Sequence, residues 1–189
     1  MESKLDFNGF HTRSVHAGAR PDAVTGSRAQ PIHQTTSYVF EDSDSAAAYF
    51  NLQEYGNTYS RIMNPTVAAL EERVANLEGA VGGVAFASGL AAQSAALFTL
   101  LDPGDHVVAS KSLYGGSTTQ LKHLLRKLSV GLDFAEADDP EDWKRLTKSN
   151  TKLFFGETIG NPSGVVLDIE ALAGIAHEAC LPLMIDNTF

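Results

Sequence analysis

The sequence predicts an α/β fold: a mostly parallel β-sheet with helices on both faces. Apolar strand-like runs alternate with helix-like runs over residues 83–186, and strands that are joined through helices pair in parallel. The last run, Leu183–Asp186, also brings a carboxylate to the carboxyl end of a strand. Ligands of open α/β sheets bind outside that edge, so this acid is expected to face a ligand.

The expected strands and helices alternate in a regular order. The strands are Gly83–Ala87, His106–Ser110, Leu132–Glu136, Lys152–Glu157 and Leu183–Asp186. The helices between them are Leu90–Leu101, Gly116–Leu128, Pro140–Lys148 and Asp168–Cys180. This order predicts one sheet whose carboxyl edge gathers the loops that follow the strands.

The region before these runs is expected to be less regular. Residues 1–40 show little apolar periodicity and are predicted to form an irregular arm. Asp42–Gln53 is predicted to be a short helix that is capped by Ser43 or Asp44.

A longer helix is predicted to begin directly after Asn64. Asparagine is a good N-cap residue. Proline suits the first helical position, where Pro65 stands, because the N–H group that it lacks would have no partner within the helix. Apolar residues then recur at spacings of three and four: Val67, Leu70, Val74 and Leu77. Gly79 is expected to end the helix, since glycine readily takes the left-handed conformation of a C-cap.

Composition and charge describe an acidic chain of ordinary globular make-up. The 189 residues are 43% hydrophobic and 20% charged, and their net charge is −9. This charge disfavours nucleic acid and membrane surfaces as partners, because both bind basic patches. No apolar run is long enough to span a bilayer, no signal peptide is expected, and a single cysteine excludes a disulfide framework. The expected location is the cytoplasm.

Two short segments are candidates for binding an anion. Ser88, Gly89 and Leu90 stand where a strand gives way to a helix, and the free N–H groups of a helix start bind anions. The alternative is an ordinary tight turn. Arg61, which follows Tyr59 in a polar loop, can hold a phosphate through two parallel hydrogen bonds. The alternative there is a solvated surface arginine.

Three further candidates follow expected strands. Tyr114 can stack on a flat ligand ring, or pack in an ordinary loop. Asn161 can donate a hydrogen bond to a ligand oxygen, or serve an Asn-Pro turn. Asp186 can hold a proton on a heterocyclic nitrogen, or instead cap a helix or form an ion pair. With the anion cradle they describe a flat, phosphorylated pyridine, whereas the scattered histidines form no metal-ligand set.

An ordered set of motifs runs through nearly the whole chain. It consists of Tyr59-Ser60-Arg61 with Asn64-Pro65-Thr66, Leu77-Glu78-Gly79, Ser88-Gly89-Leu90-Ala91, Leu113-Tyr114-Gly115-Gly116, Glu157-Thr158 with Asn161-Pro162, and Asp186-Asn187-Thr188-Phe189. This set resembles the Cys/Met-metabolism family of pyridoxal-phosphate enzymes, which have the type I aminotransferase-like fold. The resemblance implies pyridoxal 5'-phosphate as cofactor and a truncated type I large domain.

The resemblance implies a role for each part of the anion site and for the division of the chain. Gly89 and Leu90, next to Ser88, would bind the cofactor phosphate through backbone N–H groups. Tyr59 and Arg61 would reach the phosphate of a neighbouring subunit in a dimer, within a tetramer. Residues 1–60 would form an arm and short helix that contact that subunit. Residues 61–189 would form the N-terminal part of the cofactor-binding large domain.

The resemblance also implies roles around the cofactor ring. Tyr114 would stack on the ring and help to transfer protons, and Tyr59 is the second expected catalytic residue. Asn161 would lie near the ring hydroxyl. Asp186 would keep the ring nitrogen protonated, and Thr188 would support the ring or Asp186.

Within the family, the N-terminal stretch resembles the O-acetylhomoserine sulfhydrylases most. Its markers include His16-Ala17-Gly18, Gln34-Thr35-Thr36-Ser37-Tyr38, and Phe50-Asn51-Leu52 before Gly56-Asn57. Those enzymes replace the acetate of O-acetylhomoserine with sulfide or a thiol, and form homocysteine or methionine. Cystathionine γ-synthase and methionine γ-lyase share nearly all of these residues and stay open as alternatives.

One departure from the family concerns its cofactor-binding lysine, which lies on a Ser-x-Thr-Lys segment beyond the position of Asp186. The sequence ends before such a segment. The 189 residues alone are therefore expected to be inactive, with the lysine on a C-terminal polypeptide. A non-catalytic module that binds phosphate or pyridoxal phosphate is an alternative. A nucleotide-binding domain is a weaker one, since no Gly-x-Gly-x-x-Gly follows the first strand.

Overall fold

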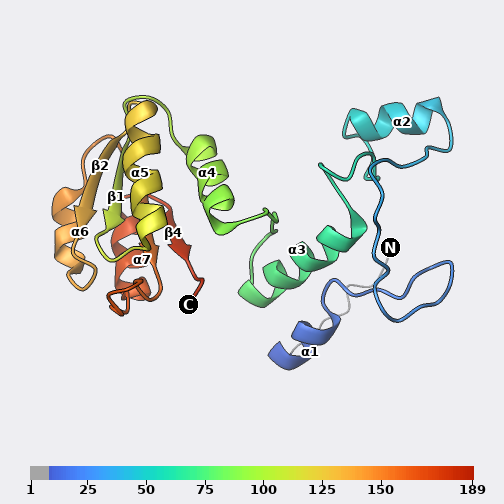
Figure 1. The fold of residues 1–189 in the computed structure, drawn as a ribbon, viewed down its shortest axis with the longest axis horizontal. Helices are drawn as coiled ribbons and strands as arrows, with labels where there is room; N and C mark the ends of the chain where they lie inside the picture. The colour runs from blue at the N-terminus through green and yellow to red at the C-terminus, as the bar shows by residue number, and fades with distance from the viewer. Residues whose placement is uncertain (1–8) are drawn as a thin grey trace. The chain divides into compact units, whose positions relative to one another are not determined.

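The computed structural model describes residues 9–189. The chain divides into two compact units, Met1–Ala85 and Phe86–Phe189. The described part of the first unit holds helices α1 (Phe10–His16), α2 (Ser43–Phe50) and α3 (Pro65–Glu78), and the second unit holds the sheet (Figure 1). The boundary predicted between residues 60 and 61 separates the segment expected to contact a neighbouring subunit from the cofactor-binding part. It stays a prediction.

Helix α3 has the ends that the sequence predicts. The Asn64 side chain accepts a hydrogen bond from Thr66 N at 2.9 Å, and Pro65 occupies the first turn. Gly79 ends the helix in the left-handed conformation, with φ of 68°. The N-cap and C-cap predictions are confirmed because each depends on one residue type in one backbone conformation.

Helix α1 contradicts the prediction of an irregular arm. It has seven residues and no side-chain N-cap, and so short a helix is unstable in isolation. Contacts with α3 hold it. Arg13 Nη1 donates to the Asn76 carbonyl at 2.7 Å, and Arg73 Nε donates to the Ala17 carbonyl at 2.8 Å. The helix depends on a tertiary contact that local periodicity does not reveal.

The prediction of a short helix here is confirmed by α2, but the predicted N-cap residue is wrong. Asp42, not Ser43 or Asp44, caps it, because the Asp42 carboxylate accepts from Ser45 N at 2.7 Å. The helix ends at Phe50, before the predicted end at residue 53.

The second unit contains one sheet of four parallel strands in the order β2-β1-β3-β4. The strands are β1 (His106–Ser110), β2 (Gly131–Ala135), β3 (Thr151–Glu157) and β4 (Leu183–Asp186). The helices are α4 (Gly89–Leu100), α5 (Gly115–Lys127), α6 (Pro140–Leu146) and α7 (Ile169–Glu178). The predicted alternation of strands and helices is confirmed from β1 to β4.

The strand predicted over Gly83–Ala87 is not formed. A strand is stabilised by hydrogen bonds to a neighbouring strand, and no segment of the described chain pairs with these residues. Ala85 N instead donates to the Glu71 carboxylate at 2.7 Å. An apolar run without a partner strand therefore remains irregular.

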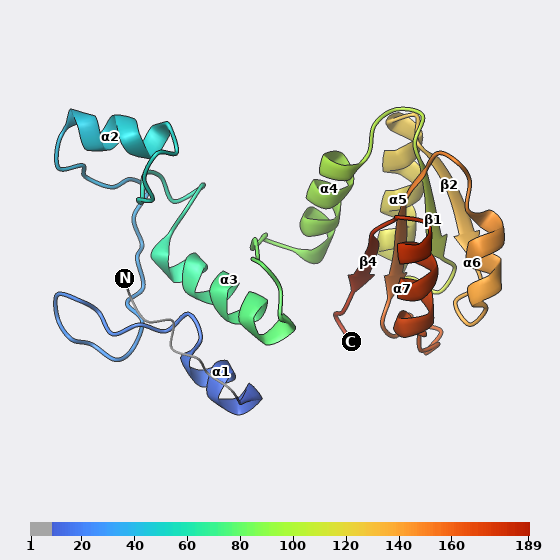
Figure 2. The same cartoon turned by 180° about the vertical axis from the view of Figure 1, so that it is seen from behind.

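Alternate strand residues build two separate cores, one on each face of the sheet. Val107 and Phe155 pack with buried residues of α4 and α5. Val108 and Phe154 pack on the other face, with Trp143 of α6 and the buried residues of α7. Figures 1 and 2 show α5 on one side of the sheet and α6 and α7 on the other. The prediction of helices on both faces is confirmed.

The carboxyl ends of β3 and β4 coincide. Glu157 at the end of β3 pairs with Asp186 at the end of β4. The Thr158 N–H continues the ladder to the Asp186 carbonyl at 3.1 Å. Two carboxylates therefore stand side by side at the edge where α/β sheets bind ligands.

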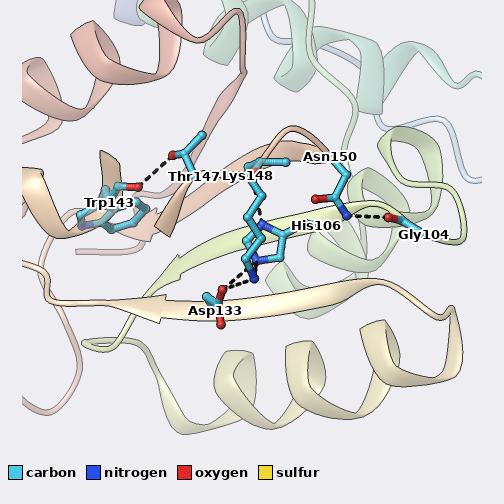
Figure 3. Close-up of polar contacts among 8 residues, drawn as sticks. Gly104, His106, Asp133, Trp143, Thr147, Lys148 and Asn150 are labelled. Atoms are coloured by element: carbon cyan, nitrogen blue, oxygen red, sulfur yellow. Dashed lines mark hydrogen bonds and ion pairs between the residues drawn. The ribbon is translucent and has the colours of Figure 1, made fainter. Parts of the chain in front are cut away.

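The opposite end of the sheet buries a histidine in a polar cluster (Figure 3). His106 Nδ1 lies 2.9 Å from the Thr151 hydroxyl, and His106 Nε2 lies 3.1 Å from Asp133 Oδ2. Lys148 Nζ donates to the same Asp133 oxygen at 2.5 Å. The Thr151 hydroxyl accepts from Lys148 N at 2.8 Å, so its own proton is available for Nδ1. This network satisfies a neutral imidazole that donates its Nε2 proton to Asp133.

We expect the pH dependence of stability to report this buried imidazole. Burial lowers the pKa of His106 from 6.5 and the Lys148 ammonium lowers it further, whereas Asp133 raises it. The unfolded chain therefore binds the proton first, and the stability from this group is complete above pH 6.5 and is lost as the pH falls through the lowered pKa. The free energy of unfolding, measured by urea titration, should decrease as the pH falls below 6.5.

His106→Asn should remove this part of the pH dependence. His123→Asn, at an exposed histidine of α5, should keep it. Asp133 does not titrate in the same window, because hydrogen bonding from Lys148 lowers the pKa of its carboxyl from 3.8. An equal pH dependence in the wild type and in His106→Asn would contradict the assignment.

Candidate functional site

A cavity of about 340 Å³ lies at the carboxyl edge of the sheet. Its size is within the range of small-molecule sites, about 300–1,000 Å³. The predicted site residues of the second unit all line it: Ser88, Gly89, Leu90, Tyr114, Asn161, Asp186 and Thr188. The structure therefore brings together residues that are up to 100 positions apart in the sequence, which is the difference between Ser88 and Thr188.

The start of α4 forms the part of the cavity that suits an anion. Ser88 caps the helix, and its Oγ accepts from Ala91 N at 3.2 Å. The N–H groups of Gly89 and Leu90 precede the first intrahelical hydrogen bond, which runs from Ala92 N to the Ser88 carbonyl at 3.0 Å. A Cβ built on Gly89 meets no atom within 4 Å, so the backbone is open to a ligand. These two N–H groups can bind a phosphate.

Tyr114 lies at the start of α5 with half of its surface exposed. Its backbone N–H donates to Glu157 Oε1 at 2.7 Å, which fixes the loop to the end of β3. Gly116 gives its ring room, because a Cβ there would lie 2.3 Å from Tyr114 Cε1. The Tyr114 ring therefore packs next to Gly116 and forms part of the cavity wall.

Glu157 joins two of the loops that form the cavity. It is buried at the end of β3, and its Oε2 accepts from Asn161 N at 3.4 Å while Oε1 accepts from Tyr114 N. One carboxylate therefore positions both Tyr114 and Asn161. Sequence reasoning did not name Glu157 as a site residue, although it ends an apolar strand as Asp186 does.

Asp186 is half-buried and hydrogen-bonded on both carboxylate oxygens. Its Oδ1 accepts from Thr188 N at 3.1 Å and from Thr188 Oγ1 at 2.6 Å. Its Oδ2 accepts from Gln93 Nε2 at 2.9 Å. The carboxylate is therefore held in one orientation at the cavity wall.

Gln93 and Ser117 also line the cavity and were not predicted. Gln93 stands four residues after Gly89, so it lies on the same face of α4, one turn beyond the anion site. Ser117 stands three residues after Tyr114, in the first turn of α5. A polar residue one turn beyond each candidate is the signal in the sequence that would have found them.

The cavity wall is acidic. It contains Glu157 and Asp186, whereas none of the described residues that line it is a lysine, arginine or histidine. The helix start supplies only partial positive charge. A phosphate dianion bound here would need a cationic side chain from outside this set of residues.

Tyr59 and Arg61 belong to the first unit. Their loop is held by an antiparallel bridge between Ser37 and Tyr59 and by a hydrogen bond from Ser60 N to the Thr36 carbonyl at 2.9 Å. Both side chains are exposed.

The described residues show neither a metal-binding group nor a membrane span. Within residues 9–189, no three His, Cys, Asp or Glu side chains are arranged to hold a metal ion. None of the helices in this part of the chain is long and apolar enough to cross a membrane.

The sheet, the helix start and the paired carboxylates define a ligand-binding α/β domain suited to a phosphorylated ring. Comparison with known proteins identifies the family. The chain belongs to the family described as Cys/Met metabolism PLP-dependent enzyme, whose profile matches residues 11–189. The predicted family, its type I fold and its dependence on pyridoxal phosphate are confirmed.

The curated relatives include several sulfhydrylases. The O-acetyl-L-homoserine sulfhydrylase of Corynebacterium glutamicum is 49% identical over 187 residues, which are 98% of this chain and 43% of that protein. The enzyme of the same name from Leptospira meyeri is 48% identical over 177 residues, 94% of this chain and 40% of that protein. The chain therefore spans less than half of the length of these relatives.

A solved structure shows the same fold with a cofactor adduct. It is a putative O-acetylhomoserine (thiol)-lyase from Campylobacter jejuni with N'-pyridoxyl-lysine-5'-monophosphate, 39% identical, with a TM-score of 0.90. The match covers 95% of this chain and 44% of that chain.

Proposed function

We propose that the chain forms part of a pyridoxal-phosphate-dependent O-acetylhomoserine sulfhydrylase. This enzyme replaces the acetate of O-acetylhomoserine with sulfide or a thiol, and forms homocysteine or methionine. The observation that carries the proposal is the cavity at the carboxyl edge, where the start of α4, Tyr114 and Asp186 lie together. The identity to sulfhydrylases supports the choice of substrate.

The residues present fit the cofactor. Pyridoxal phosphate, when bound, supplies a ring that accepts the electron pair left when an amino acid loses its α-proton. In this proposal the N–H groups of Gly89 and Leu90, with Ser88, bind the phosphate. Asp186 holds a proton at the ring nitrogen, and Thr188 orients its carboxylate through the two hydrogen bonds described above.

The proposal assigns the remaining cavity residues to the ring itself. Tyr114 stacks on the ring and moves a proton, as expected of an aromatic side chain with a hydroxyl group. Asn161 contacts the ring hydroxyl. We assign Glu157 no contact with the cofactor. It positions Tyr114 and Asn161 by accepting hydrogen bonds from their backbone N–H groups.

The acidic cavity wall supports a contribution from a second subunit. We assign the required positive charge to Arg61 of a neighbouring copy, with Tyr59 beside it as the second catalytic tyrosine. The protein would then be a dimer or tetramer in which residues 1–60 contact the neighbour and residues 61–189 build the cofactor site. We place the enzyme in the cytoplasm.

The test is the reaction of the purified native protein loaded with pyridoxal phosphate. O-acetylhomoserine and sulfide should give homocysteine, and methanethiol in place of sulfide should give methionine. Mass spectrometry identifies each product.

Other products would identify the alternatives. Cystathionine from cysteine and an acylated homoserine, without homocysteine from sulfide, would indicate a cystathionine γ-synthase. Methanethiol released from methionine would indicate a γ-lyase. Cofactor binding without any of these reactions would indicate a non-catalytic module.

A further inference from the structure

Gln93 is a buried polar residue in a mostly apolar helix. Helix α4 reads Gly-Leu-Ala-Ala-Gln-Ser-Ala-Ala-Leu-Phe-Thr-Leu, and its buried positions are Gln93 and Leu97. Only 7% of Gln93 is exposed. A buried amide destabilises a fold unless hydrogen bonds compensate for the lost contact with water. Its partners should therefore reveal why a glutamine is present.

The hydrogen bonds of Gln93 determine its orientation. Nε2 donates to Asp186 Oδ2 at 2.9 Å and to the Ser117 hydroxyl at 3.2 Å. An ionised carboxylate only accepts hydrogen bonds, so the NH₂ group must face Asp186. Oε1 is buried and has no hydrogen-bond partner among the described residues. The side chain therefore keeps its link to Asp186 although its own carbonyl is left unsatisfied.

The remaining hydrogen-bonding capacity of Asp186 is small. A carboxylate has about four lone-pair positions. Thr188 occupies two of them on Oδ1 through its backbone N–H and its hydroxyl, and Gln93 occupies one on Oδ2. The position left on Oδ2 is available to a ligand in the cavity that Asp186 lines. Thr188 and Gln93 together fix the plane of the carboxylate from opposite oxygens.

We propose that Gln93 is a positioning residue for Asp186. Its amide holds the carboxylate in one orientation, so that Oδ2 can accept a hydrogen bond from the protonated ring nitrogen of the cofactor. This inference rests on the role of Asp186 in the proposed function. Without the amide, Oδ2 loses this donor and only Thr188 orients the carboxylate, through Oδ1. This loss weakens the hydrogen bond between the carboxylate and the protonated ring nitrogen.

The test measures the ring nitrogen directly, by ¹⁵N NMR of pyridoxal phosphate that is labelled at that atom and bound to the native protein. Gln93→Met removes the donor and keeps the length of the side chain. Gln120→Met is the matched control, because Gln120 Nε2 also joins α5 to α4, through the Leu90 carbonyl at 2.8 Å, without contacting Asp186.

In Gln93→Met the nitrogen signal should move toward the unprotonated position, because the carboxylate that faces the ring nitrogen is no longer held at Oδ2. Gln120→Met should keep the wild-type signal. A wild-type nitrogen signal in Gln93→Met at every pH would overturn the proposal.

A second measurement does not depend on the folding of a variant. In wild-type protein labelled with ¹⁵N-glutamine, the side-chain amide signal of Gln93 should move when cofactor binds, and that of Gln120 should not. An unmoved Gln93 signal would also overturn the inference. Failure of the proposed function is distinct, since Asp186→Ala would then leave the ring nitrogen signal unchanged.

Discussion

Asp186→Ala should reduce turnover of the native enzyme by about 10²–10³-fold, the usual effect of removing one preorganised electrostatic group. The carboxylate ends β4, lines the cavity and is oriented by Thr188 and Gln93. In the proposed function it keeps the ring nitrogen protonated, which stabilises the charge that develops when the substrate loses its proton. Steady-state kinetics of homocysteine formation, at saturating cofactor, measures the effect.

The neighbouring residue provides the control for this prediction. Asn187 is exposed at the same strand end, and its Oδ1 accepts from the Thr158 hydroxyl at 2.6 Å. Asn187→Ala should leave turnover close to that of the wild type. Near-normal turnover in Asp186→Ala would refute the role assigned to Asp186.

Trp143→Ala should lower the free energy of unfolding of the second unit by about 3–5 kcal/mol, the usual cost of truncating a buried tryptophan. Trp143 is completely buried, and its ring centroid lies 5.4 Å from that of Phe154. Its indole N–H donates to the Glu136 carbonyl at 2.9 Å. The substitution leaves a cavity in the core between the sheet and helices α6 and α7.

Denaturant unfolding followed by circular dichroism measures this loss. Phe98→Ala is the control, because Phe98 is a large aromatic residue of the same unit that is mostly exposed. It should cost less than about 1 kcal/mol, in line with surface substitutions. Equal losses in the two variants would show that Trp143 does not anchor this core.

Local sequence signals predicted the elements that need only local information. The ends of α3 follow from Asn64 and Gly79, whose side chain and backbone conformation act within one turn. The order of β1 to β4 follows from apolar runs separated by helical ones. Tyr114, Asn161 and Asp186 follow from the same signals, since each stands at the end of a strand or within four residues after it.

Long-range contacts explain the predictions that failed. Helix α1 forms although its sequence shows little periodicity, because Arg13 and Arg73 tie it to its neighbour in the fold. Gly83–Ala87 has the composition of a strand and stays irregular, because no described segment pairs with it. In both cases the deciding hydrogen bonds join residues that are distant in the chain.

The sequence by itself determined the family, the parallel sheet and the residue types that suit a phosphorylated pyridine, because these depend on motifs and on periodicity. Only the tertiary structure decided which of those residues share one cavity and how they are held there. Glu157 ties two loops together, and Gln93 reaches Asp186 across 93 positions of sequence. Such contacts depend on how strands and helices pack, and no local pattern of residues encodes that geometry.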